Sequence, residues 1–244
     1  MKREVLDSHY IKLAANIEEY FDQSSEILWD RRNKIRIIDF LDEKIVAKAF
    51  KIPHIINRVA YSFFRDSKAK RSYENSLMLD DFVPKPIGYV EFYMFGLLHK
   101  SYFLSTYYPY DFTIREVLLD QSFEDRVKIL QEFAYFTYRL HEMGAEHLDY
   151  SPGNILIKYT DKGYEFKVID VNRMRFGRIS LQQRVENFSK LWADEKDLAT
   201  IVKAYATLTG ADSNALERWA IEASQKHKAK VNMKKRLKGK EVVN

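Results

Sequence analysis

The stretch that decides the fold reads His141-Glu-Met-Gly-Ala-Glu-His-Leu-Asp-Tyr-Ser-Pro-Gly-Asn-Ile-Leu-Ile157. Just before and at its start, apolar residues recur at the spacing of one buried helix face: Ile129, Phe133, Phe136, Leu140 and Met143. Gly144 is suited to end this helix, because glycine readily adopts the left-handed conformation common at helix ends. The apolar run that closes the stretch favours a strand. The stretch therefore predicts a helix, a polar loop and a strand in succession.

The loop in this stretch matches the catalytic loop of kinases. In that loop an Asp accepts the proton of the substrate hydroxyl, and an Asn shortly after it ligates Mg²⁺. Asp149 and Asn154 keep the kinase spacing, with His147 just before Asp149. A lone His-x-Asp is more often a surface turn with an Asx cap, but the complete string favours catalysis. We predict Asp149 and His147 as catalytic residues and Asn154 as a metal ligand.

A second candidate metal ligand follows the next apolar run. Asp170, in Val168-Ile-Asp-Val-Asn-Arg173, takes the place of the kinase Asp that binds the metal ion between the nucleotide phosphates. Val171-Asn172 replaces the usual Phe-Gly. An Asp at a strand end is usually only a turn former, but its position shortly after Asn154 favours a ligand. Two oxygen donors from neighbouring loops suit Mg²⁺, which keeps waters and phosphate oxygens in its other positions.

A candidate nucleotide-binding strand lies upstream. Val46-Ala-Lys48 resembles the Val-Ala-x-Lys strand of kinases with one residue missing, and strand alternation places Val46 and Lys48 on one face. An apolar residue there would cover adenine while Lys48 reaches the phosphates. Glu74, on the helix that follows, is the expected ion-pair partner of Lys48, and a solvated carboxylate on a helix face is the alternative. The Gly-rich turn that covers phosphates in kinases is missing from residues 30–34.

The first part of the chain is rich in strand patterns. After a short amphipathic opening at 8–22, three apolar runs predict an antiparallel meander at about 26–29, 35–40 and 45–50. A helix follows at 72–79. Two more strands are expected at about 87–95 and 98–107, joined near Gly96.

The second part is mainly helical. Besides the helix before Gly144, patterns at about 181–208 and 213–232 predict helices, and runs at 154–157 and 166–169 predict a hairpin. The fold class is therefore α+β with two lobes, as in protein-kinase-like proteins. We expect an N-terminal nucleotide-binding lobe at 1–106, a catalytic lobe at 107–225 and a basic tail at 226–244.

Composition excludes several classes of site. The chain has no Cys, which rules out disulfides and thiolate metal sites. No apolar run approaches the roughly 20 residues of a spanning helix, and acids near the N-terminus argue against a signal peptide, so a cytoplasmic protein is expected. Residues 226–240 hold eight Lys or Arg and no acid. This run suits phosphate-bearing partners, with nucleic acid and anionic lipid both qualifying, and a frayed, solvated tail is the other reading.

Four segments together resemble the bacterial lipopolysaccharide kinase (Kdo/WaaP) family: Lys48–Tyr61, Lys68–Leu79, Tyr107–Val117 and His147–Phe176. The resemblance spans roughly residues 25–205. It implies a kinase using ATP and Mg²⁺ that phosphorylates a Kdo or heptose hydroxyl of the lipopolysaccharide inner core, on a lipid A precursor. It also implies a peripheral position on the cytoplasmic face of the inner membrane, contacted through 226–240, with no nucleic-acid partner.

The resemblance assigns roles to the candidate residues. Asp149 would be the base, Asn154 and Asp170 the Mg²⁺ ligands, and Lys48 with Glu74 the phosphate clamp.

A non-protein acceptor agrees with the sequence after Asp170. It contains no Ala-Pro-Glu and no long activation segment, on which protein kinases place peptides. Arg173 and Arg175, followed by Arg178, could hold an anionic acceptor, and structural salt bridges are the alternative reading. Two other functions share these residues: an atypical protein Ser/Thr kinase of the Rio-like kind, and a non-catalytic pseudokinase or nucleic-acid-binding module. Phosphate on a protein acceptor would favour the first, and failure to bind Mg·ATP the second.

Overall fold

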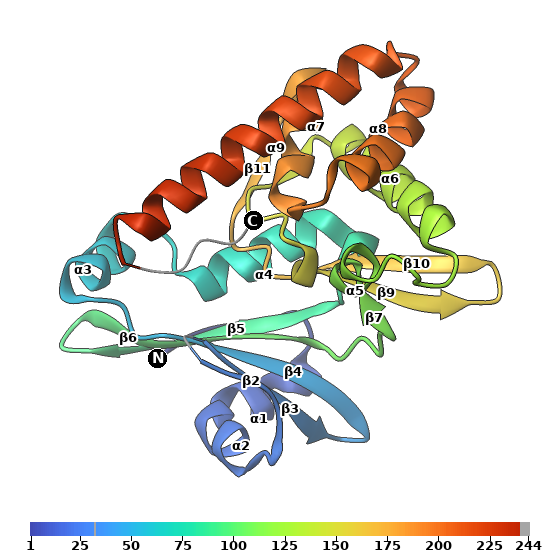
Figure 1. Ribbon diagram of the computed structural model, residues 1–244. Coiled ribbons are helices and arrows are strands. Elements are labelled where there is room, and N and C mark those ends of the chain that lie inside the picture. Colours follow the sequence, from blue (N-terminus) through green and yellow to red (C-terminus); the bar gives the residue numbers. More distant parts are fainter. Residues whose placement is uncertain (32, 240–244) are drawn as a thin grey trace. The chain divides into compact units, whose positions relative to one another are not determined.

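The protein is described by a computed structural model that covers residues 1–31 and 33–239 (Figure 1). The last residues of the predicted basic tail, 240–244, lie outside the described residues. The chain forms two compact units. The first consists of Met1–Pro109 together with Asp170–Arg173, and the second of Tyr110–Ile169 together with Met174–Asn244.

The first unit is built on one antiparallel sheet. Its strands are β1 (Lys2–Val5), β2 (Glu26–Asp30), β3 (Lys34–Phe40), β4 (Glu43–Phe50), β5 (Pro86–Met94) and β6 (Leu97–Thr106). Their order across the sheet is β1-β5-β6-β4-β3-β2. Its helices are α1 (Ile11–Ala15), α2 (Ile17–Gln23), α3 (Ile55–Phe63) and α4 (Lys68–Leu79). The predicted meander and the β5–β6 hairpin turning at Gly96 are both confirmed.

Because side chains alternate along each strand, the two faces of the sheet pack against different helices. One face packs with α1 and α2 in a core that includes Ile45 and Ala47 of β4. The other face carries Phe50, which packs with Ala69 and Tyr73 of α4. Figure 1 shows α1 and α2 on one side of the sheet and α4 on the other. The side chains of successive β4 residues thus lie on opposite faces of the sheet, as strand geometry requires.

Two elements of this unit were not predicted from the sequence. β1 pairs with β5 at the sheet edge, and α3 lies in a segment for which no element was predicted. Helix α4 also begins earlier than predicted, at Lys68, because the Ser67 side chain accepts a hydrogen bond from the Lys70 backbone N–H and caps it.

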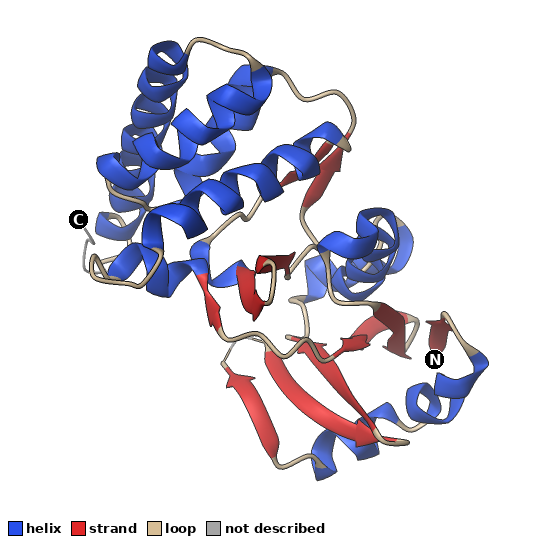
Figure 2. Cartoon of the chain, turned by 90° about the vertical axis from the view of Figure 1, so that its right-hand side faces the viewer, coloured by secondary structure: helices blue, strands red, loops and turns tan. Residues whose placement is uncertain are grey.

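The second unit is mainly helical (Figure 2). Its helices are α5 (Ile114–Leu119), α6 (Arg126–Glu142), α7 (Leu181–Asn187), α8 (Glu195–Thr209) and α9 (Ser213–Arg236). Short strands accompany them: β7 (Phe112–Thr113), β8 (Ala145–His147), β9 (Ile155–Thr160), β10 (Gly163–Val168) and β11 (Met174–Phe176). The predicted β9–β10 hairpin is confirmed. The helical region predicted at 181–208 contains two helices, α7 and α8, with a left-handed Trp192 between them.

Residues of the predicted basic tail up to Arg236 continue α9. Among residues 1–31 and 33–239, each helix is too short or too polar to cross a membrane.

The turn after α6 depends on Gly144. Its φ is +72°, and a Cβ atom there would lie 2.6 Å from the backbone oxygen of Gly177, whose N–H donates to the Gly144 carbonyl at 2.9 Å. A side chain at position 144 would therefore cause both backbone strain and overlap with the Gly177 oxygen.

We expect Gly144→Ala to lower the free energy of unfolding by about 2–3 kcal/mol. Gly210→Ala is the matched control, because Gly210 has φ +68° but nothing within 4 Å of the added Cβ. It should cost about 1–2 kcal/mol, the backbone strain alone. Urea unfolding of both variants measures the difference, and equal losses would contradict a role for the Gly177 contact.

Candidate active site

The loop that carries Asp149 is held by a buried histidine. His147 ends β8 and is fully buried. Its Nε2 lies 3.0 Å from the carbonyl oxygen of Ile169, and its Nδ1 lies 3.1 Å from the backbone nitrogen of Asp149. A carbonyl only accepts and a backbone N–H only donates, so Nε2 carries the proton of the neutral ring. These contacts make His147 a positioning residue that orients the Asp149 backbone.

Asn154 closes the same loop from its other end. Its side-chain Nδ2 donates to the Asp149 carbonyl at 2.9 Å. This hydrogen bond fixes the orientation of the amide group, so that its Oδ1 points away from the Asp149 carbonyl. The Asn154 carbonyl accepts from the Ile169 N–H, also at 2.9 Å. Ile169 therefore touches both ends of the loop, through His147 and through Asn154. The residue that follows Ile169 is Asp170.

Asp149 is half-buried and lies within the field of a lysine. Burial lowers the pKa of Lys190, while the charges of Glu146 and Asp149 act in the opposite direction. Sequence reasoning did not single out Lys190.

In the first unit, Lys48 and Asp170 form an ion pair. Lys48 Nζ lies 2.7 Å from Asp170 Oδ1, and both side chains are largely shielded from solvent. Asn172 Nδ2 donates to the same oxygen. Asp170 has φ +59°, a left-handed conformation that Asp and Asn tolerate better than most residues. Asn172, which the sequence showed only as a departure from Phe-Gly, thus helps to orient the predicted metal ligand.

The ion pair predicted between Lys48 and Glu74 is not formed, and this prediction needs correction. Glu74 Oε1 lies 3.5 Å from Lys70, one turn away on α4, and about half of its side chain is exposed. Asp170 takes the place beside Lys48 instead. A lysine at i−4 is always within reach of a helical glutamate, which favours the local partner. The link from α4 to this segment runs through Asn75, whose Nδ2 donates to the Val171 carbonyl at 2.6 Å.

Val46 and Lys48 share a face of β4, as strand alternation predicts. Both alternate with Ile45 and Ala47, which belong to the core on the opposite face. Lys48 Nζ also lies 5.3 Å from the ring centroid of Phe50. The face that would cover a nucleotide base therefore offers an apolar side chain and an amine from one strand.

The arginines predicted for the acceptor differ in their surroundings. Arg175 forms an ion pair with the buried Glu146, which is the structural alternative that the sequence left open. Lys190 approaches the same carboxylate at 3.9 Å. Arg173 belongs to the first unit and Arg178 lines a groove of the second.

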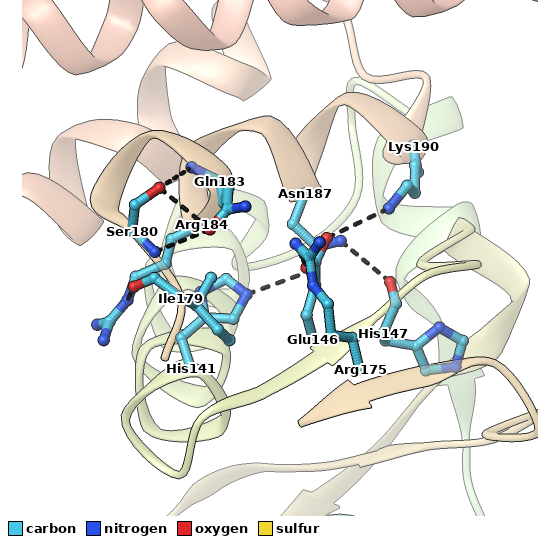
Figure 3. A network of polar contacts seen from close by, with 10 residues as sticks. All are labelled: His141, Glu146, His147, Arg175, Ile179, Ser180, Gln183, Arg184, Asn187 and Lys190. Carbon is cyan, nitrogen blue, oxygen red and sulfur yellow. Dashed lines mark hydrogen bonds and ion pairs between the residues drawn. The ribbon is translucent and has the colours of Figure 1, made fainter. Parts of the chain in front are cut away.

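A series of buried polar side chains links His141 through Asn187 to the backbone of His147, two residues before Asp149 (Figure 3). Asn187, at the end of α7, donates through Nδ2 to the His147 carbonyl at 3.0 Å. Its Oδ1 lies 3.4 Å from Nε2 of His141, and Nδ1 of His141 lies 3.0 Å from the Tyr205 hydroxyl. The Asn187 oxygen can only accept, so Nε2 of His141 carries the proton and Tyr205 donates to Nδ1. The sequence contains no signal for these contacts, because the residues come from helices α6, α7 and α8 and strand β8.

The burial of His141 in these contacts should make the free energy of unfolding depend on pH. Burial lowers the pKa of His141 from 6.5 to about 3. Between these pH values the unfolded chain binds a proton that the folded chain excludes, so stability is greatest above pH 6.5 and falls as the pH drops toward 3. The slope from this group reaches at most about 1.4 kcal/mol per pH unit.

Urea unfolding at several pH values measures the slope, and His141→Gln should make it shallower. His9→Gln, at an exposed histidine, should leave it unchanged. Should the Gln variant unfold, the NMR signals of the His141 ring in the wild-type protein provide the same check. Titration of that ring near pH 6.5 would contradict the expectation.

The donors present fit a magnesium ion rather than a metal held by protein alone. Within residues 1–31 and 33–239, no group of three His, Asp or Glu side chains is arranged to bind a metal. Mg²⁺ commonly takes one or two protein oxygens and completes its shell with water and phosphate. Asp170 and Asn154 are donors of this kind, and their convergence on one ion stays a prediction.

Comparisons with known proteins bear on the fold and on the family. Residues 114–218 match the sequence model of the lipopolysaccharide kinase (Kdo/WaaP) family. Among solved structures, "WaaP in complex with acyl carrier protein" aligns over 93% of this chain and 99% of that chain, with 12% sequence identity and a TM-score of 0.56. The MAP kinase LmaMPK10 from Leishmania major aligns over 78% of this chain and 59% of that chain, with 18% identity and a TM-score of 0.44. No curated protein matches the chain in sequence.

The family match and the WaaP structure agree with the expectations drawn from the sequence. The α+β, protein-kinase-like fold is confirmed by the WaaP structure. The family model covers less than half of the chain, so it shows a similarity to lipopolysaccharide kinases over residues 114–218. The resemblance of the chain to the Kdo/WaaP lipopolysaccharide kinase family is thereby confirmed, through residues 114–218 and the shared fold.

Proposed function

We propose that the protein transfers the γ-phosphate of ATP to a sugar hydroxyl, on Kdo or heptose, of the lipopolysaccharide inner core. The observation that carries this proposal is the attachment of the Asp149 loop to Ile169. His147 and Asn154 both hydrogen-bond to the backbone of Ile169, and Asp170 is the next residue. The loop that carries Asp149 and Asn154 is thus hydrogen-bonded to Ile169, and Asp170 follows Ile169 directly in the sequence.

Each residue has a role in the transfer. Asp149 accepts the proton of the acceptor hydroxyl as its oxygen bonds to the γ-phosphorus, and ADP leaves with the electrons of the broken P–O bond. Lys48 neutralises charge on the α and β phosphates, with Val46 against the base. Asp170 and Asn154 would hold Mg²⁺, which when bound offsets the charge that develops on the phosphate oxygens.

The acceptor site is proposed to be basic. Arg173 and Arg175 follow Asp170 in sequence, and guanidinium groups bind carboxylates and phosphates in a bidentate manner. Arg175 already pairs with Glu146 and keeps half of its side chain exposed. An acceptor anion could therefore share it. Lipid A carrying a core sugar offers both kinds of anion.

The protein is also proposed to work at the cytoplasmic face of the inner membrane. Its basic run continues along α9, where Lys228 donates to the Ala193 carbonyl at 3.0 Å and Lys235 lies 5.9 Å from the Trp192 ring centroid. Part of this charge is thus bound to the protein itself. The remaining basic side chains would attract anionic lipid, at about 1 kcal/mol each.

Incubation with labelled ATP and Kdo-lipid A tests the chemistry. We expect label on the lipid in the presence of Mg²⁺ and none after EDTA treatment. Heptose-containing core acceptors in parallel identify the sugar. Label only on a protein acceptor would favour the Rio-like alternative, and absence of Mg·ATP binding in a thermal-shift titration would favour a non-catalytic protein.

A further inference from the structure

Helix α3 presents an unusually apolar surface. Its large side chains and those of its flanks are exposed: Ile52, Ile55, Ile56, Val59, Phe63 and Phe64. Ile56 is 81% exposed and Phe64 85%. Helices normally bury such a face. A contiguous apolar surface of this kind usually marks an interaction site.

The helix is attached to the sheet through its polar side. Arg58 Nε donates to the Leu98 carbonyl at 2.8 Å, and the Ser62 hydroxyl accepts from the Leu98 N–H, also at 2.8 Å. The Ser62 hydroxyl in turn donates to the Arg58 carbonyl at 2.7 Å. Two hydrogen bonds thus join α3 to β6, and Ile56 and Phe63 on α3 are exposed to solvent.

The neighbouring hairpin extends this surface. Phe95, at the tip between β5 and β6, is 95% exposed and precedes Leu98 by three residues. Arg65 stacks on Tyr61 at 5.7 Å from the ring centroid. A cation beside an amphipathic aromatic ring is suited to the level of lipid headgroups.

Charge around α3 selects the kind of partner. Residues 51–71 contain six Lys or Arg and only one acid, Asp66. An apolar stripe flanked by basic residues is the signature of helices that lie in the surface of an anionic membrane. A second copy of this chain would bring the same positive charge to the contact and repel it.

We infer that α3 inserts its apolar side chains into the surface of an anionic lipid bilayer, with the flanking Lys and Arg at the phosphate groups. This goes beyond the electrostatic attraction proposed for α9, because α3 offers apolar area to bury. It does not depend on phosphate transfer. Binding can be measured without ATP, and its failure would leave the proposed chemistry untouched.

Vesicle co-sedimentation of the full chain tests the apolar contribution. We expect binding to phosphatidylglycerol vesicles and little to phosphatidylcholine vesicles. The double variant Ile56→Asp/Phe64→Asp should bind phosphatidylglycerol roughly tenfold more weakly or worse, since two buried side chains are lost. Leu119→Asp changes a side chain that is equally apolar and 78% exposed on α5, and should bind as the wild type does.

A fluorescent label provides a direct readout of insertion. The chain has no cysteine, so Ile56→Cys and Leu119→Cys each accept a single environment-sensitive dye. With anionic vesicles, we expect the dye at position 56 to shift to the blue and to be shielded from aqueous quenchers, and the dye at 119 to stay unchanged.

Three results would overturn the inference. The first is a dye at 56 that remains fully quenched on bound vesicles. The second is vesicle binding that survives the Asp substitutions and disappears only with salt, which would make attraction purely electrostatic. The third is shielding of that dye at high protein concentration without lipid, or by an acidic protein such as an acyl carrier protein, in place of vesicles.

Discussion

Asp149→Asn is expected to slow phosphate transfer to the lipopolysaccharide acceptor by about 10²–10⁴-fold, the usual cost of removing a general base. Asn has nearly the same shape, and two contacts that hold this position use its backbone: the N–H donates to His147 and the carbonyl accepts from Asn154. The loop should therefore keep its conformation. The loss would come from the missing carboxylate alone.

The assay measures labelled phosphate on Kdo-lipid A at saturating Mg·ATP. Asp161→Asn, in the exposed turn between β9 and β10, is the control and should transfer phosphate at the wild-type rate. Thermal-shift titration should show that Asp149→Asn still binds ATP. A variant that retains more than half of the wild-type rate would refute the assignment of the base.

Asp170→Asn is expected to lower both Mg·ATP binding and phosphate transfer, the latter by about 10²-fold or more. The substitution removes the charge that pairs with Lys48 and that would hold the metal ion. Asn adopts the left-handed conformation nearly as well as Asp, so the backbone at φ +59° should be kept. The effect should therefore be on binding and rate rather than on folding.

The matched control is Asp42→Asn. Asp42 is exposed and has φ +66°, so it repeats the same substitution in the same backbone conformation away from Lys48. Thermal shift as a function of Mg²⁺ at fixed ATP, together with the transfer rate, measures the outcome. Wild-type dependence on Mg²⁺ in Asp170→Asn would show that this carboxylate is not a ligand.

Much of the fold could be predicted because its signals are local. The apolar runs around Ile37 and Ile45 and the turn at Gly96 act over a few residues, and the structure has strands and a turn at these places. Helix α3 was not predicted, although its sequence carries a helical signal: Ile52, Ile55, Ile56, Val59 and Phe63 recur at helical spacing. The helical region predicted at 181–208 is present, and the left-handed conformation of Trp192, between its two helices, had no signal in the sequence analysis.

In the candidate site, too, some features follow from the local sequence and others only from the fold. The spacing of Asp149 and Asn154 is a property of the sequence, and the hydrogen bond between them follows from that short separation. The partner of Lys48 does not follow from spacing. Glu74 and Asp170 are both carboxylates far from Lys48 in sequence, and only the folded chain shows that Asp170 is the one in contact.

By itself, the sequence determined the helix, loop and strand around Asp149, the antiparallel strands of the first unit and the resemblance to a kinase family. These follow from caps, turns and alternation, which act between near neighbours. Only the tertiary structure decided that His141, Asn187 and His147 form one buried chain and that α3 leaves its apolar side uncovered. Such contacts join residues far apart in the chain, and packing alone determines which of many possible partners is within reach.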